Sequence, residues 1–166
     1  MKDSKQRNIF KQWIDSHAGL LFKIARAYAL TADDRDDLFQ EISLQVWRSI
    51  PHFRNESAVT TWLYRIALNT ALRWKSNEQK HATQGLGEMP VLAEIKPQNE
   101  RIDWLYDEIG QLNEIDRSLC LLLLDDFSYK DMADMLGISE SNVAVKIHRI
   151  KKYLIDQSKK MSHYEI

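Results

Sequence analysis

The side chains best suited to bind a ligand lie near the C-terminal end of the sequence, on one face of a helix expected over residues 139–155. Asn142 and Arg149 have the donors and acceptors that read the edges of DNA bases, and Lys146 and Lys152 can neutralise phosphates. The exposed face consists of Ser141, Asn142, Val145, Lys146, His148, Arg149 and Lys152, with Val143, Ile147, Ile150 and Leu154 on its buried side. A basic helix end that complements the helix dipole is the plainer interpretation.

The residues before this helix favour DNA binding. Ser128 can cap a short helix over 128–136, and Gly137 permits the positive φ of a tight turn. Ser139 can cap the next helix, whose first buried residue is Val143. Ala133 is small where two helices must cross closely. Together these residues predict a helix-turn-helix, the motif that lays its second helix in the DNA major groove.

A helix expected over residues 33–50 has a second face of interest. Its buried stripe is expected to be Phe39, Ile42, Ser43, Val46 and Ile50. The opposite face carries Asp37, Gln40, Glu41, Leu44 and Arg48, with Trp47 on its flank. A solvated charged face and a protein-binding patch are both open, although apolar anchors ringed by polar groups are typical of a patch.

A third face lies on a helix expected over residues 58–77. Its buried stripe is expected to be Leu63, Ile66, Ala67, Thr70 and Trp74. Away from the stripe lie Trp62, Arg65, Asn69, Arg73 and Ser76, and before the helix comes the polar loop Phe53-Arg54-Asn55-Glu56-Ser57. Aromatic, guanidinium and amide groups in one line suit exposed bases and phosphates. Taken alone, the pattern fits an ordinary amphipathic helix better, because mixed faces of arginine and aromatic residues are common.

The sequence shows no catalytic constellation. Its five histidines are scattered without metal-ligand spacing, and no phosphate-binding loop or nucleophile elbow is present. The acids at 33–37 fall at a helix start, where acids are expected. Cys120 lies in an apolar run and predicts a buried structural thiol. We therefore expect a protein that is not an enzyme and holds no metal or cofactor.

These faces must be positioned by a small globular protein. The chain has 166 residues, 44% apolar and 28% charged, with a net charge of −1. Acids dominate residues 101–134 and bases dominate 135–160. Because the total charge is too small for a strong grip on DNA, another molecule is expected to supply much of it. Without a signal core or a membrane-spanning run, the sequence predicts a cytoplasmic protein with no membrane insertion.

The periodicity predicts an all-α fold in two small helical domains. Helices are expected over residues 8–29, 33–50, 58–77, 100–111, 115–125, 128–136 and 139–155. Pro51 is expected to end the second of them. The stretch between the domains is aperiodic and rich in Gly and Pro, which indicates a flexible linker. The expected division is a first domain over 1–78, a linker over 79–99 and a second domain over 100–160.

Two segments together resemble the extracytoplasmic-function (ECF) type of RNA polymerase sigma factor. They are Asp36-Asp37-Leu38-Phe39-Gln40-Glu41-Ile42 with Trp47-Arg48, and Phe53-Arg54-Asn55-Glu56-Ser57-Ala58 with Thr61-Trp62-Leu63-Tyr64-Arg65-Ile66-Ala67-Leu68-Asn69-Thr70-Ala71. The second run is highly specific. The first domain then resembles sigma region 2, and residues 104–154 resemble region 4.

The resemblance gives each face a role in transcription initiation. It implies that Asp37, Gln40, Glu41, Leu44, Trp47 and Arg48 bind core RNA polymerase, at the clamp helices of β′. It implies that Phe53, Arg54, Asn55, Ser57, Trp62, Arg65, Asn69 and Arg73 bind the promoter −10 element, the loop over 53–58 holding a flipped base. The helix-turn-helix would bind the −35 element, near the polymerase β flap. Ala144 stands where many members of the family have a basic residue.

Two other functions fit parts of the sequence. A helix-turn-helix regulator could bind an operator without polymerase, but it would leave the face of helix 33–50 unexplained and would need a dimer interface. A helical adaptor could bind protein alone, but it would leave the basic face of helix 139–155 without a purpose. The resemblance implies core RNA polymerase and promoter DNA as partners, and it suggests an anti-sigma factor as a further partner.

Overall fold

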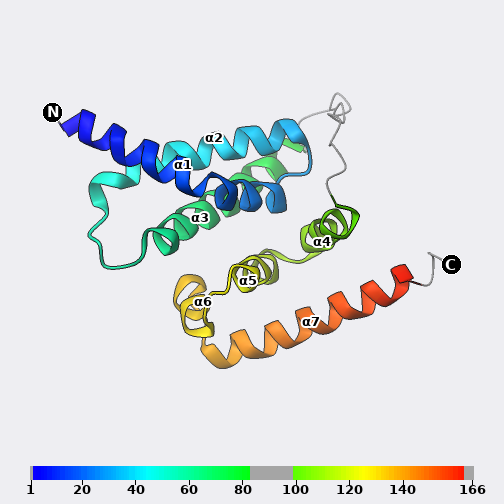
Figure 1. Ribbon diagram of the computed structural model, residues 1–166. Coiled ribbons are helices and arrows are strands. Elements are labelled where there is room, and N and C mark those ends of the chain that lie inside the picture. The colour runs from blue at the N-terminus through cyan, green and yellow to red at the C-terminus, as the bar shows by residue number, and fades with distance from the viewer. Residues whose placement is uncertain (1, 83–98, 163–166) are drawn as a thin grey trace. The chain divides into compact units, whose positions relative to one another are not determined.

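A computed structural model describes residues 2–82 and 99–162 and divides the chain into two compact units, Met1–Gln98 and Asn99–Ile166 (Figure 1). Every regular element within the described residues is helical. The expected all-α fold is therefore confirmed. Of the linker expected over 79–99, residues 79–82 belong to a helix and Asn99 caps another, while 83–98 lie outside the described residues.

The first unit is a bundle of three long helices. α1 (Lys2–Tyr28), α2 (Ala32–Ser49) and α3 (Val59–Ala82) each pack against the other two. A short 3-10 helix, η1 (Ile50–His52), follows α2 and contains Pro51. The α-helix therefore ends before the proline, as predicted. The Thr31 hydroxyl accepts a hydrogen bond of 3.1 Å from the Asp34 amide and caps α2. α1 and α3 are longer than the periodicity predicted.

Three residues of the predicted stripe of α2, Ile42, Val46 and Ile50, are buried, and Leu38 is buried in addition. Leu38, Ile42 and Val46 are fully buried, whereas Phe39 is half-buried with its ring 5.8 Å from that of Phe22. Ser43, also expected inside, is half-buried. Because both α1 and α3 pack against α2, the buried line follows the i, i+4 row that faces both partners.

The buried face of α3 differs from prediction in the same way. Ile66 and Trp74 were expected in the core and are half-buried. The side chains that fill the core instead are Tyr64, Leu68 and Ala71, beside the correctly predicted Leu63, Ala67 and Thr70. A helix covered by two neighbours buries a wider arc than the single stripe of an amphipathic helix on a flat surface.

The second unit contains four helices. They are α4 (Glu100–Gln111), α5 (Glu114–Leu124), α6 (Tyr129–Leu136) and α7 (Glu140–Ser162). Its core combines Ile109, Leu119, Leu122, Met132, Val143, Ile147 and Ile150. Leu154, expected in this core, is half-buried. Directly before Leu154, the Tyr153 hydroxyl donates a hydrogen bond of 2.8 Å to Glu108 Oε2 and ties α7 to α4.

One buried cation holds the turn between α4 and α5. Arg117 is only 3% exposed, and its guanidinium donates to the carbonyls of Ile109, Gly110 and Leu112 at 3.3, 2.6 and 2.9 Å. These carbonyls lie at the C-terminal end of α4, where backbone acceptors lack helical partners and a positive charge is favourable. Cys120 is buried in α5, as predicted, and burial raises the pKa of its thiol to about 11.

Candidate nucleic-acid interface

The outer face of α2 presents polar groups around an apolar side chain. Asp37, Gln40 and Arg48 are exposed, and Leu44 keeps 41% of its surface open to solvent. Glu41 is half-buried and accepts a hydrogen bond of 3.0 Å from Gln45 Nε2. The face is thus available to a partner along the length of the helix.

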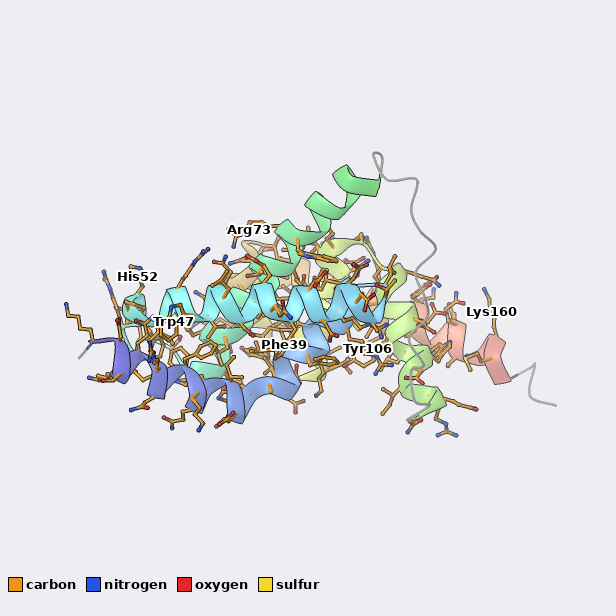
Figure 2. The ribbon with its side chains drawn as sticks, turned by 90° about the horizontal axis from the view of Figure 1, so that it is seen from above. Phe39, Trp47, His52, Arg73, Tyr106 and Lys160 are labelled. Atoms are coloured by element: carbon orange, nitrogen blue, oxygen red, sulfur yellow. The ribbon has the colours of Figure 1, made fainter. Side chains whose placement is uncertain are left out.

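Trp47 is held by the bundle rather than standing free on this face. Its ring packs edge-on against Phe10 with centroids 5.5 Å apart, and its backbone carbonyl accepts a hydrogen bond of 2.8 Å from Gln6 Nε2. Trp47 is therefore half-buried and in contact with α1, beside the α2 face. Figure 2 shows Trp47 near the end of α2, with Phe39 farther back along the helix and His52 just beyond it.

The loop after η1 and the start of α3 enclose a hollow of about 520 Å³. Its lining residues are His52, Phe53, Arg54, Glu56, Ser57, Trp62 and Arg65. Asn55, at the turn of the loop, adopts a left-handed conformation with φ 57°, which asparagine tolerates better than most residues. We call this space the loop hollow.

Three aromatic rings support the loop hollow. The Phe53 ring lies 5.2 Å from that of Trp13 and 5.4 Å from that of Trp62. The Trp62 indole also donates a hydrogen bond of 3.3 Å to Ser49 Oγ, which fixes the ring against the end of α2. Aromatic rings beside the side chains of Arg54 and Arg65 are suited to bind a flat base together with its phosphate.

The loop hollow brings together only part of the predicted −10 set. Phe53, Arg54, Ser57, Trp62 and Arg65 line it. Asn69 and Arg73 lie farther along α3 and line a separate hollow of about 350 Å³ between the end of α2 and the middle of α3. Sequence reasoning missed His52, which lines both spaces. Its only signal in the sequence is its position directly after Pro51.

The helix-turn-helix has the predicted local geometry. The Ser128 hydroxyl accepts from the Asp131 amide at 3.1 Å, and the Ser139 hydroxyl accepts from the Asn142 amide at 3.1 Å. Gly137 takes the left-handed conformation with φ 69°, and its amide donates to the Ala133 carbonyl at 2.9 Å. The turn is therefore built by the residues that predicted it.

The outer face of α7 is open to solvent. Lys146 is half-buried, and the other predicted contact residues are exposed; they are Ser141, Asn142, Val145, His148, Arg149 and Lys152. An exposed row of amide, guanidinium and ammonium groups on the second helix of the motif is suited to groove binding. The described part of the chain holds no group of three or more His, Cys, Asp or Glu side chains placed to bind a metal ion.

Comparison with known proteins identifies the family. Residues 13–81 match the family Sigma-70 region 2, and residues 102–154 match Sigma-70, region 4. The ECF RNA polymerase sigma factor SigM of Mycobacterium tuberculosis is 28% identical over 149 residues, which cover 89% of this chain and 76% of SigM. The chain belongs to the ECF sigma factors.

A second relative agrees with this assignment, and two solved structures share the fold. The ECF RNA polymerase sigma-E factor of Haemophilus influenzae is 28% identical over 173 residues, covering 92% of this sigma factor and 87% of the relative. The fold matches the sigma factor RpoE of Bartonella quintana, solved in complex with the anti-sigma factor NepR, with a TM-score of 0.71 and 20% identity over 90% of this chain and 96% of that one. CnrH, solved with the cytosolic domain of CnrY, matches with a TM-score of 0.65 and 20% identity over 91% and 90%.

The two regions fall on the two units of this sigma factor. Region 2 runs from within α1 to near the end of α3, and region 4 covers α4 to α6 and the first part of α7. The protein is an alternative sigma factor, which is a regulator of transcription. The match does not favour an operator-binding regulator or a helical adaptor. No helix within residues 2–82 or 99–162 is both long enough and apolar enough to cross a membrane.

Proposed function

We propose that this sigma factor docks on the β′ clamp helices of core RNA polymerase through the outer face of α2. The observation that carries the proposal is Leu44, which is 41% exposed on the same face of α2 as Asp37, Gln40 and Glu41. Covering an exposed leucine with a partner's surface stabilises the complex, and the surrounding polar groups fix the register of the two surfaces. Trp47, which is half-buried beside this face, would add to the contact.

The loop hollow captures a flipped base of the −10 element. Removing a base from the stack costs a few kcal/mol, and stacking on aromatic side chains returns about 1–3 kcal/mol per base. Phe53 and Trp62 provide the stacking wall, Arg54 and Arg65 bind the adjoining phosphates, and Ser57 offers a hydrogen bond to the base. The sigma factor thereby stabilises the melted state of the promoter.

The face of α7 binds the −35 element in the major groove. Asn142 and Arg149 read base edges, and Lys146 and Lys152 contact phosphates. Ser141, Val145 and His148 complete the face. We place the second unit beside the β flap of the polymerase. The net charge of −1 is consistent with this arrangement, because the polymerase supplies most of the electrostatic attraction that holds the DNA.

In this proposal the protein is not an enzyme and acts in the bacterial cytoplasm, where its polymerase and promoters are. Two solved relatives in fold are bound to NepR and to the cytosolic domain of CnrY. On that analogy we include an anti-sigma factor as a partner that would cover the polymerase-binding and DNA-binding faces.

Reconstituted transcription tests the proposal. Core RNA polymerase from the same bacterium, freed of other sigma factors, is mixed with the protein and a library of genomic fragments, and the 5′ ends of the transcripts are mapped. We expect discrete start sites that share one −10 and one −35 sequence, absent when the protein is omitted. Binding of the protein to core polymerase without any specific start sites, or no binding at all, would refute the proposal.

A further inference from the structure

The exposed face of α7 has an apolar side chain at its centre. Val145 keeps 49% of its surface open to solvent. The nearest neighbours of a residue on a helix surface lie three and four positions away, and for Val145 these are Ser141, Asn142, His148 and Arg149. All four are polar and exposed. The face therefore consists of a valine surrounded by groups that can hydrogen-bond.

The core of the second unit fixes the position of this valine. Val143 and Ile147, two positions before and after it, are buried, and α7 packs against both α5 and α6. Glu140 is the first residue of α7, so Val145 falls in the second turn of the helix. In a helix-turn-helix, residues near the start of the second helix contact the edges of the bases.

The stability of α7 does not explain a valine at this position. Alanine, leucine and lysine all favour a helix more than valine does, because the branched side chain loses χ1 freedom there. The same restriction is useful for binding, since one strongly preferred rotamer holds the two methyl groups in a defined place. A partner that covers Val145 then orders few additional degrees of freedom.

The major groove of DNA offers one apolar group that such a side chain can contact. This group is the C5-methyl of thymine, whereas the other groove edges are hydrogen-bond donors and acceptors. A valine placed over the amino group of cytosine, or over the acceptors of guanine, would remove water from them and return no hydrogen bond. An apolar centre on the groove-facing side of a helix thus favours thymine at the base pair that it covers.

We propose that Val145 is a specificity-determining residue, which recognises the 5-methyl group of one thymine in the −35 element by van der Waals contact. The inference rests on the proposed function, in which this face of α7 lies in the major groove. It places a thymine, on either strand, against the second turn of α7. Asn142 and Arg149, which lie on opposite sides of Val145 along the helix, contact the polar edges of the neighbouring base pairs.

Removing a single methyl group from the DNA tests the contact. The probe is a promoter fragment found by transcript mapping, in which each thymine of the −35 element is replaced singly by deoxyuridine. Deoxyuridine pairs as thymine does and lacks only the methyl group. The holoenzyme is assembled from core RNA polymerase and the full chain, and its affinity for each probe is measured by competition with the unmodified fragment. If the protein bound no core polymerase or gave no start sites, the proposed function itself would be refuted, and the methyl contact with it.

The variant is Val145→Ala, and Ile155→Ala is its matched control. Ile155 is 54% exposed farther along α7 and lies outside the predicted −35 set. We expect one thymine at which deoxyuridine weakens wild-type binding about fourfold, the effect of one buried methyl group. Val145→Ala should bind the unmodified fragment more weakly and should lose almost nothing further at that position. Ile155→Ala should show the same loss as the wild type.

The converse experiment adds a methyl group. At the thymine that responds, the base pair is changed to cytosine with guanine, and this probe is compared with one that carries 5-methylcytosine in the same place. We expect the methyl group to raise the affinity of the wild type about fourfold and that of Val145→Ala very little. Equal deoxyuridine losses in wild type and Val145→Ala would assign the effect to another residue or to DNA shape and would overturn the proposal. A −35 element without thymine, or one in which no deoxyuridine changes the affinity, would overturn it as well.

Discussion

Replacing Asp37 and Leu44 together by alanine should weaken binding to core RNA polymerase and leave the fold intact. Both side chains are exposed on α2, and neither belongs to the core of the first unit. Alanine is the best helix former, so α2 keeps its intrinsic stability. We therefore expect the free energy of unfolding to change by less than about 0.5 kcal/mol.

The exposed fraction of Leu44 sets the scale of the binding loss. Complete burial of a leucine side chain is worth about 1.5–3 kcal/mol. Because 41% of Leu44 is still exposed in the free protein, covering that exposed part contributes about 0.6–1.2 kcal/mol. A hydrogen bond to the Asp37 carboxylate adds about 1.5–3 kcal/mol. The combined loss of about 2–4 kcal/mol raises the Kd for core polymerase about 30- to 700-fold.

Competition binding and thermal unfolding check this prediction together. The double variant competes with labelled wild-type protein for core polymerase, and circular dichroism follows its unfolding. The matched control is Asp15→Ala with Leu30→Ala, which removes the same two residue types from exposed positions outside α2; Leu30 is 79% exposed. If the control lost as much affinity as the test variant, or the test variant competed as well as wild type, the assignment of this face would be wrong.

Three further changes test other parts of the molecule. Asn69→Ala should reduce promoter opening more than initial docking, because its amide is exposed on the side of α3 that we propose binds DNA; permanganate reactivity of melted thymines measures opening, and Asn8→Ala, exposed on α1, serves as the control. Gly137→Ala should lower the stability of the second unit by about 1 kcal/mol through its left-handed backbone alone, since an added Cβ would meet nothing within 4 Å; a urea midpoint shift measures it. Burial raises the pKa of Cys120 to about 11, so at pH 8 iodoacetamide should alkylate the folded protein at least about tenfold more slowly than the urea-unfolded chain; equal rates would contradict the burial.

Local signals in the sequence predicted the helix-turn-helix almost residue by residue. The caps at Ser128 and Ser139 and the turn at Gly137 depend on side chain and backbone within three or four residues, so tertiary packing has little to change there. The same holds for the end of α2 at Pro51. The polar residues around Leu44 were also predicted to lie outside the core, because helical periodicity separates them from the apolar row.

Packing between helices decided what lies inside the first unit. Tyr64 and Leu68 are buried and Phe39 is only half-buried, against the predicted stripes. The periodicity gives the direction of an apolar face, but the number and angle of neighbouring helices determine how far around the helix burial extends. In the second unit, Arg117 is buried because three carbonyls at the end of α4 converge on it, an arrangement that no spacing within α5 could indicate.

The sequence by itself determined the helices, the turn and the family, because these depend on local geometry and on runs of specific residues. Only the tertiary structure decided which polar side chains share a space. Arg48 and Asn69 are far apart in the sequence and on different helices, yet they line one hollow, and His52 joins that hollow to the loop at Phe53. Such a site exists because α2 and α3 pack side by side, and the distance between two helix faces is a property of their packing rather than of either sequence segment.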